Sequence, residues 1–256
     1  HIGAALFDRG TRKMIPTEQG KILYNSIVEA VDKLEHVEKY FHRKCDKERM
    51  TINMGMCFET FQYVLEPYIS KFEFNLVSKF GNYPEMLNEL DKGLLDFVIT
   101  PQREEMQNVS YTPFSKERVV LIAGGGTRVD DFPKLQAKAD LKKIEDWLMH
   151  QKWFGTTGDM EHLRNFWQHN FGKRANVKLN YIVPNLTSIV RCLSNNEGVA
   201  VVPDFLCKGV LNDGSVRVLW EGITPLENTL YFAQRKKTMY QKEIETLQKI
   251  FADTMG

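Results

Sequence analysis

The sequence has few cysteines. Its 256 residues contain four, Cys45, Cys57, Cys192 and Cys207, and no two of them form a CxxC pair. Without such a pair or a tight Cys/His cluster, the spacing indicates neither a zinc site nor a disulfide framework. We therefore interpret the four as reduced, structural thiols in a reducing compartment.

Long apolar runs are also missing. No stretch approaches the ~20 apolar residues that a membrane-spanning helix needs. The opening residues, HIGAALFDRG, lack the apolar core and cleavage site of a secretory signal. We therefore expect a cytoplasmic protein without membrane contact. Because the chain opens on His1 in what reads as the middle of a domain, we also expect it to be a fragment.

Neither a strong charge nor a catalytic motif is present. The formal net charge is +1, so DNA binding would have to depend on a local patch. No HExxH, GxSxG, GxGxxG or phosphate-loop pattern appears, since the run Gly124, Gly125, Gly126 is not followed by Lys and Ser or Thr. We predict no enzymatic activity, no cofactor and no metal site. At 43% hydrophobic and 26% charged, the composition suits one large globular domain or two smaller ones.

A long amphipathic helix is predicted after Thr17, which follows Pro16 and suits an N-cap. Apolar residues then recur with steps of 4, 3, 4, 3 and 4, the heptad spacing of paired helices. They are Leu23, Ile27, Ala30, Leu34, Val37 and Phe41. The residues around them are mostly charged, so the helix has one apolar stripe. It suits either dimerisation or packing on its own domain, and we favour dimerisation.

From Met50 the pattern changes to alternating strands and helices, which predicts βαβ units and a largely parallel sheet. The expected strands are 51–56, 74–80, 95–99, 109–114, 118–123, 153–155, 177–183, 199–202, 216–220 and 230–233. The expected helices are 58–72, bent at Pro67, then 84–92, 162–171, 187–195 and 240–255. The fold class is therefore α/β. The four tryptophans are expected in the core.

Ligands of such sheets bind beyond the carboxyl ends of the strands, where helices begin. The candidate residues directly follow predicted strands: Cys57, Phe58, Glu59, Asn82, Tyr83, Thr100, Pro101, Thr156, Asn185 and Thr187. Short polar residues at these positions are equally typical of ordinary helix caps. For Glu59 we favour stabilisation of the dipole of its own helix over ligand contact.

Three motifs occur in an order that resembles one known family. Leu6 to Arg9, then Arg12, Lys13 and Pro16 to Gly20, resemble the wing of LysR-type transcriptional regulators. ELDKGLLDFVI, residues 89–99, and LSNNEGVAVVP, residues 193–203, resemble two stretches of that family's effector domain. Two departures are Asn196, where the family has Gly, and a shorter segment at 72–80.

The resemblance implies a domain organisation. Residues 1–17 would be the wing of a winged helix-turn-helix whose recognition helix is absent from this chain, and 18–49 the linker helix. Residues 50–256 would be a two-lobed effector-binding domain like type 2 periplasmic binding proteins. Lobe one would take 50–123 and 226–256, and lobe two 124–225. The cations Arg9, Arg12 and Lys13 would contact DNA, although a solvated charged turn is the alternative.

The implied function is a ligand-responsive regulator. A small-molecule effector would bind between the lobes and alter how a homodimer or homotetramer holds double-stranded DNA. One alternative is a solute-binding transport receptor of the same fold, and another is an enzyme such as a transferase. Mass in solution separates them, because a transport receptor should be monomeric.

Overall fold

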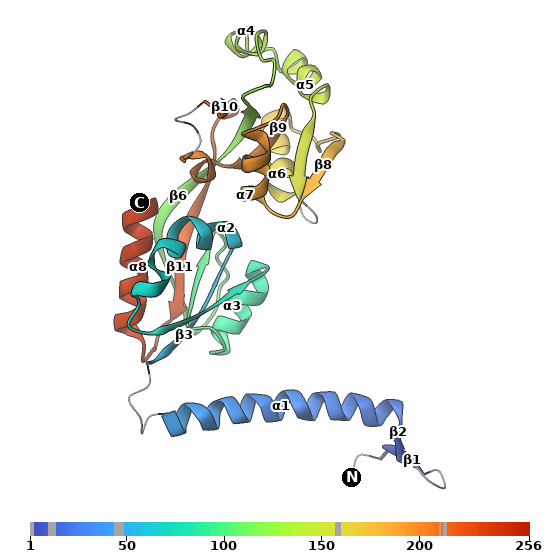
Figure 1. The fold of residues 1–256 in the computed structure, drawn as a ribbon, viewed down its shortest axis with the longest axis vertical. Helices are drawn as coiled ribbons and strands as arrows, with labels where there is room; N and C mark the ends of the chain where they lie inside the picture. The colour runs from blue at the N-terminus through green and yellow to red at the C-terminus, as the bar shows by residue number, and fades with distance from the viewer. Residues whose placement is uncertain (1–2, 10–13, 44–48, 157–159, 210, 212–213) are drawn as a thin grey trace. The chain divides into compact units, whose positions relative to one another are not determined.

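The computed structural model describes residues 3–9, 14–43, 49–156, 160–209, 211 and 214–256. For Arg9 and for residues 29–30, 32–33 and 35–43 it describes the backbone alone. The chain packs as two compact units, His1–Met50 and Thr51–Gly256 (Figure 1).

The first unit is a short hairpin followed by a long helix. Strands β1 (Phe7–Arg9) and β2 (Met14–Pro16) pair antiparallel, and helix α1 spans Glu18–Arg43. The predicted N-cap is confirmed, because the Thr17 hydroxyl accepts from the Gly20 amide at 3.1 Å. A Cβ on Gly20 would stand 2.1 Å from the Leu6 carbonyl oxygen. The Thr-Glu-Gln-Gly motif therefore fixes the hairpin against the start of the helix.

Phe7 does not point into a core in this unit. Phe7 is 49% exposed, and Leu6 is half-buried. Two strands of three residues beside one helix form too few layers to enclose a large aromatic ring. The tip of the hairpin, with Arg12 and Lys13, lies outside the described residues.

The second unit is built on one mixed sheet. Its described residues form nine strands in the order β4-β3-β5-β11-β6-β9-β7-β8, with β10 on β6. Their bounds are β3 Thr51–Met56, β4 Asn75–Phe80, β5 Phe97–Thr100, β6 Val109–Gly124, β7 Trp153–Thr156, β8 Leu179–Val183, β9 Val199–Pro203, β10 Val216–Trp220 and β11 Leu226–Arg235. The α/β class is confirmed. Strands β3–β5 and β7–β9 pair parallel within their groups, whereas β6 and β11 pair antiparallel.

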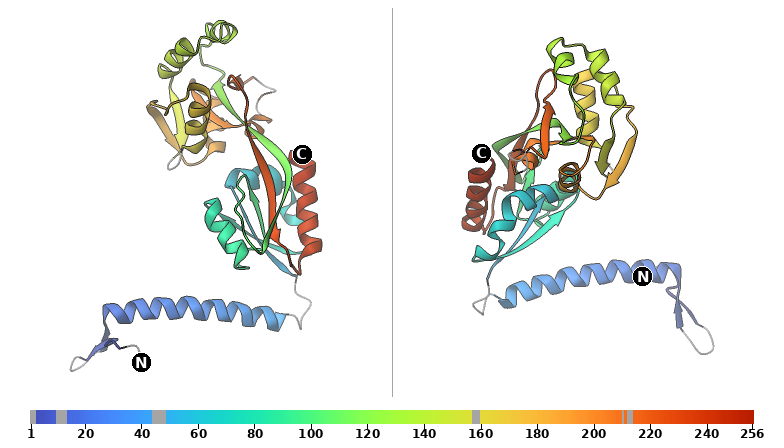
Figure 2. Two further views of the ribbon diagram at one scale, coloured as in Figure 1. Left: turned by 180° about the vertical axis from the view of Figure 1, so that it is seen from behind. Right: turned by 45° about the horizontal axis from the view of Figure 1, so that its top comes forward.

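Strand β6 is continuous where two strands were predicted. The polar run Ser115 to Glu117 reads as a loop in the sequence, yet it pairs with β11 throughout, after one register shift. Figure 2 shows β6 and β11 running side by side between two lobes. Lobe one contains β3 to β5, and lobe two contains β7 to β10.

Helices cover both faces of the sheet in lobe one. They are α3 (Tyr83–Asp91) and α8 (Gln241–Met255), with the helical stretch from Phe58. The single helix predicted there changes type, from α2 (Phe58–Thr60) to a π-helical turn (Phe61–Leu65) and a 3-10 turn (Glu66–Lys71). Pro67 lies in the first turn of the last segment, where its missing N–H costs no hydrogen bond.

Lobe two contains two helices that the sequence reading missed, α4 (Phe132–Ala137) and α5 (Leu141–Met149), besides α6 (Glu161–Phe171) and α7 (Leu186–Leu193). A short 3-10 turn, Asp204–Cys207, follows β9. Between α4 and α5, Ala139 adopts a φ of 49°. The core prediction is confirmed for three tryptophans, which are at most 7% exposed: Trp153, Trp167 and Trp220.

Candidate functional site

The register of the sheet brings strand ends from the two lobes to opposite sides of one crossing. Thr100, which ends β5, pairs with Tyr231, and Pro203, which ends β9, pairs with Val119. Between these levels β6 and β11 cross from one lobe to the other, with Glu117 opposite Asn228. The carboxyl ends of the parallel strands therefore face one another across the crossing, the usual ligand position in such sheets. We call this region the cleft.

Two candidate asparagines act as helix caps. The Asn82 Oδ1 atom accepts from the Glu85 amide at 2.9 Å at the start of α3. The Asn185 Oδ1 atom accepts from the Ser188 amide at 2.8 Å at the start of α7. The amide nitrogen of Asn82 also donates to Glu85 at 3.2 Å, whereas that of Asn185 stays available as a donor.

Cys57 and Tyr83 form a neutral polar corner at the strand ends of lobe one. The Cys57 Sγ atom lies 2.8 Å from the Thr60 hydroxyl. Burial raises the pKa of the Cys57 thiol to about 11, and it raises that of Tyr83, which hydrogen-bonds Cys57, well above its ordinary value. A thiol that stays protonated is a poor nucleophile, so this corner offers hydrogen-bonding groups without charge.

Aromatic and threonine side chains complete the part of the cleft in lobe one. Phe58 is 38% exposed and meets Phe80 edge-to-face at 5.5 Å between ring centres. Thr100 is fully buried and precedes Pro101. Its hydroxyl accepts from the Gln102 amide at 2.9 Å and donates to the Gln102 carbonyl at 3.1 Å. That hydroxyl is therefore committed to its own turn.

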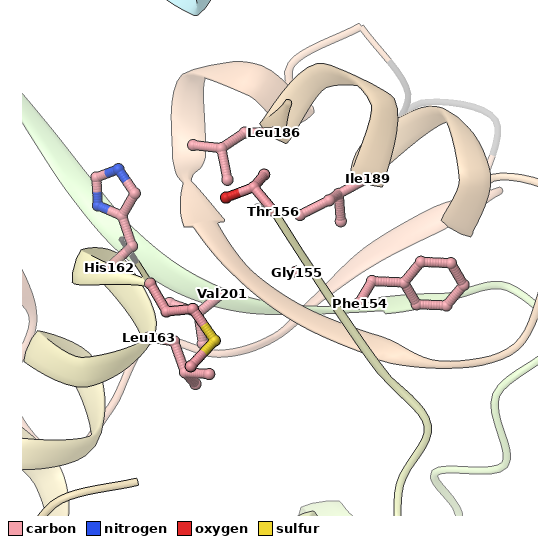
Figure 3. A pocket seen from close by; sticks show the side chains of 9 residues that line it. Phe154, Gly155, Thr156, His162, Leu163, Leu186, Ile189 and Val201 are labelled. Carbon is pink, nitrogen blue, oxygen red and sulfur yellow. The ribbon is translucent and has the colours of Figure 1, made fainter. Parts of the chain in front are cut away.

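Lobe two contributes a small cavity of about 30 Å³. In Figure 3, Thr156 from β7, His162 from α6 and Leu186 from α7 surround the same space. Its remaining lining is mostly apolar: Phe154, Gly155, Met160, Leu163, Ile189 and Val201. A space of this size holds about one water molecule. A larger ligand would need the lobes to separate or the lining to move.

A direct hydrogen bond joins the two lobes. The Glu59 Oε1 atom accepts from the Leu186 backbone N–H at 3.1 Å, at the first residue of α7. The carboxylate thus serves the amino terminus of a helix in the other lobe, whereas the sequence reading assigned it to its own helix. Next to it the Thr187 hydroxyl oxygen is enclosed and has no hydrogen-bond partner. Tyr63 and Phe205 also meet across the lobes, 5.3 Å between ring centres.

Sequence reasoning missed Glu117. This residue of β6 is only 8% exposed, and its Oε1 atom accepts from the Asn228 side chain at 3.0 Å. Burial raises the pKa of Glu117, while Asn228 and nearby His162 act in the opposite direction. Because it lies in the polar run that reads as a loop, the sequence carries no signal for a buried carboxyl group there.

The motifs that carry the family resemblance have structural roles. The Asp96 carboxylate accepts from the Asn53 backbone N–H at 2.8 Å and ties two strands together. Gly198 has a φ of 138°, and a Cβ there would lie 2.8 Å from the Lys152 carbonyl oxygen. The departure at Asn196 is accommodated, because its side chain donates to the Cys192 carbonyl at 2.8 Å.

Other kinds of site find little support. Among the described residues, no group of three or more His, Cys, Asp and Glu side chains is placed to hold a metal ion. In the same part of the chain, no helix has the length and apolarity to cross a membrane. A wider, open hollow lies beside Met106 and Tyr111, near the amino end of β6 and away from the cleft.

Two lobes joined by paired crossing strands, with helix amino termini facing the crossing, define a ligand-binding domain of the periplasmic-binding-protein type. Solved structures share this fold. LysG of Corynebacterium glutamicum, solved with bound effector Arg, matches with a TM-score of 0.59 and 16% identity over 100% of this chain and 84% of that one. CrgA of Neisseria meningitidis matches with 0.60 and 14% over 100% and 85%.

The sequence comparisons agree. Residues 47–256 match the LysR substrate binding domain family, and the chain belongs to this family. The HTH-type transcriptional regulator AbaB of Streptomyces antibioticus is 26% identical over an alignment of 175 residues, with 62% of this chain and 52% of that protein covered. The chain thus spans about half the length of this curated relative.

Proposed function

We propose that the chain is the sensing part of a LysR-type transcriptional regulator, in which a small effector bound in the cleft changes how an oligomer holds double-stranded DNA. The observation that carries the proposal is the arrangement of the lobes. The hydrogen bond from the Leu186 N–H to Glu59 joins candidate ligand-contact elements across a crossing made of two strands. A ligand that prefers one separation of the lobes shifts the population toward it.

Helix α1 supports an oligomer. Ile27 is 50% exposed and Leu34 66% exposed within the first unit, and Leu23 is half-buried. The side chains of Ala30, Val37 and Phe41 lie outside the described residues. An apolar heptad stripe exposed to this degree is typical of a helix that pairs with a second copy. We propose a homodimer or homotetramer, in the cytoplasm.

The hairpin supports DNA contact. Its strands pair Arg9 with Met14. The sequence between them, read as a charged turn with Arg12 and Lys13, lies outside the described residues. Cations on such a turn add affinity through phosphates without reading much sequence. We propose these three residues as DNA contacts of the intact protein.

The candidate effector contacts differ in whether their hydrogen-bonding atoms are already bonded within the protein. The Thr100 hydroxyl and the capping oxygens of Asn82 and Asn185 are already bonded. Thr187 is the strongest candidate, since its enclosed hydroxyl lacks a partner, and a buried polar group without one is costly. Cys57, Phe58, Glu59, Tyr83, Pro101 and Thr156 remain proposed contacts at the same strand ends.

A thermal-shift screen against amino acids, sugars, organic acids and nucleotides tests this proposal. A ligand that binds only the folded protein raises its melting temperature. The variant Thr187→Val keeps the shape of the side chain and removes the unpaired hydroxyl. We expect it to leave the melting temperature of the free protein unchanged or higher, and to weaken the response to the active compound.

The matched control is Thr246→Val, on the exposed side of α8, where the hydroxyl bonds the Lys242 carbonyl. It should leave the ligand response at the wild-type value. An equal loss of response in both variants, or a panel without any active compound, would count against an effector site in the cleft.

A further inference from the structure

Carboxylates from both lobes gather at the cleft. Glu59 reaches across it from lobe one, and Glu117 lies on the crossing strand. Glu161, at the start of α6, and Asp204, after β9, lie close enough to Glu117 to oppose its ionisation. Among the ionisable neighbours that act most on Glu117, only His162 favours the charged form of Glu117. Acidic side chains therefore outnumber basic ones among the ionisable groups that act most on Glu117.

Two cations of the described chain near the cleft are engaged elsewhere. Lys79, on β4, bonds Glu89 at 2.6 Å and Glu85 at 3.0 Å. Arg118, next to Glu117 in sequence, bonds Glu227 at 2.8 Å. These pairs leave Glu59 and Glu117 with neutral partners, a backbone N–H and the Asn228 amide.

The natural anion position of the cleft is already filled. The amino terminus of a helix attracts carboxylates and phosphates through its free N–H groups and its dipole. At α7, which spans eight residues, the Leu186 N–H donates to Glu59 and the Ser188 N–H donates to Asn185. An anionic ligand at this position would have to displace Glu59 and leave that carboxylate beside a second negative charge.

We propose that the cleft selects a cationic effector, a small molecule whose ammonium or guanidinium group bonds Glu59 and Glu117, with Glu59 as the specificity-determining residue. This inference rests on the proposed function, because it names the ligand class of the same site. A carboxylate has two oxygens, so Glu59 keeps its bond to Leu186 through one and accepts from the cation through the other. The enclosed Thr187 hydroxyl, beside Leu186, provides an unused polar contact for the rest of the ligand.

Such a ligand strengthens the closed arrangement of the lobes. The cation bonds both carboxylates, and an opposite charge within hydrogen-bonding distance favours the ionised form of a carboxylate. Charge-assisted hydrogen bonds then run from the ligand to Glu59, which itself accepts from Leu186 of lobe two, and to Glu117 on the crossing strand. Binding and lobe closure are thereby coupled through Glu59.

Pairs of probes that differ in charge test the proposal on the full chain. L-arginine is compared with L-citrulline, which replaces guanidinium by neutral urea, and agmatine and putrescine are compared with succinate and L-glutamate. Melting temperature and calorimetric binding are measured at matched ionic strength. We expect at least one cationic probe to bind, and its neutral or anionic counterpart to bind about tenfold or more weakly.

The variant Glu59→Gln keeps an oxygen that can accept from Leu186 and removes the charge. We expect it to fold and to bind the cationic probe about tenfold more weakly. Glu117→Gln, a second variant, should weaken binding in the same direction while still accepting from Asn228. The control is Glu73→Gln, an exposed acid that precedes β4 at the opposite end of lobe one, and it should bind as the wild type does.

The possible outcomes separate the two proposals. Binding of anionic or neutral probes with no response to cations would overturn the cationic selectivity and leave an effector cleft standing. Wild-type affinity for cations in both Glu59→Gln and Glu117→Gln would overturn the assignment of these carboxylates. If no probe of any class binds, the result would count against the effector cleft itself and against its selectivity.

Discussion

Helices α1 and α8 are both amphipathic, yet they end up in different surroundings. In α8, Ile244, Leu247 and Phe251 are fully buried against the sheet of lobe one. In α1, Ile27 and Leu34 leave at least half of their surface exposed within their own unit. The hydrophobic pattern alone therefore shows that a helix has one apolar side. The structure shows that the sheet of lobe one covers this side in α8, whereas Ile27 and Leu34 of α1 stay exposed.

The two helices are also held by different interactions. At the start of α8, Tyr240 gives no side-chain cap, so packing carries this helix. At the start of α1, Thr17 caps the first turn and anchors the hairpin, donating to the Ala5 carbonyl at 2.8 Å. Local hydrogen bonds alone leave a free helix marginal in water, so we expect α1 to gain its remaining stability from a second copy.

The largest expected effect is on α8. Phe251 meets Phe114 and Phe232 edge-on, 6.2 and 6.4 Å between ring centres. Phe251→Ala removes a buried ring and should lower the free energy of unfolding by about 3–5 kcal/mol. Urea denaturation followed by tryptophan fluorescence measures it. A loss below about 1 kcal/mol would mean that α8 is not part of the core in solution.

A change in α1 should act on assembly instead. Leu34→Ala should raise the dissociation constant of the dimer about tenfold or more, since each dimer loses two apolar contacts. It should leave the unfolding of residues 51–256 unchanged. Sedimentation velocity over a dilution series measures the first effect and urea denaturation the second.

The matched control is Leu94→Ala, the same substitution at a residue 49% exposed after α3. Its dimer should dissociate at the wild-type concentration. If Leu34→Ala dissociates no more readily than this control, the exposed stripe of α1 is an ordinary solvated surface.

Local patterns in the sequence predicted most of the fold. Strands β3 and β10 have the predicted bounds, and Thr17 caps α1 as expected, because each depends on neighbouring residues. Two features depended on distant partners and were missed. The polar run around Glu117 is a strand only because β11 lies beside it, and α4 and α5 bury Phe132 and Ile144 in a core shared with distant Trp220.

The same distinction holds for the cleft. Strand ends predicted which residues come together near the crossing, since that follows from the topology of parallel strands. The partner of Glu59 did not follow, because Leu186 lies 127 residues away and offers a backbone group that any residue would supply. Which candidate oxygens are already bonded, as in Thr100 and Asn185, was equally invisible in the sequence.

The smallest expected effect concerns the cap of α1. Thr17→Ala removes the acceptor for the Gly20 amide and the donor to Ala5, and a lost cap costs about 1 kcal/mol. Hydrogen exchange of the first-turn amides should therefore accelerate about fivefold, with no change in residues 51–256. Thr17→Ser keeps both bonds and should exchange at the wild-type rate. Thr246→Ala, within exposed α8 turns, should leave the first unit unaffected. Unchanged exchange in Thr17→Ala would show that an assembly partner stabilises the start of α1 more than its own first turn does. The contrast with α8, which packs within its own unit, would then be larger.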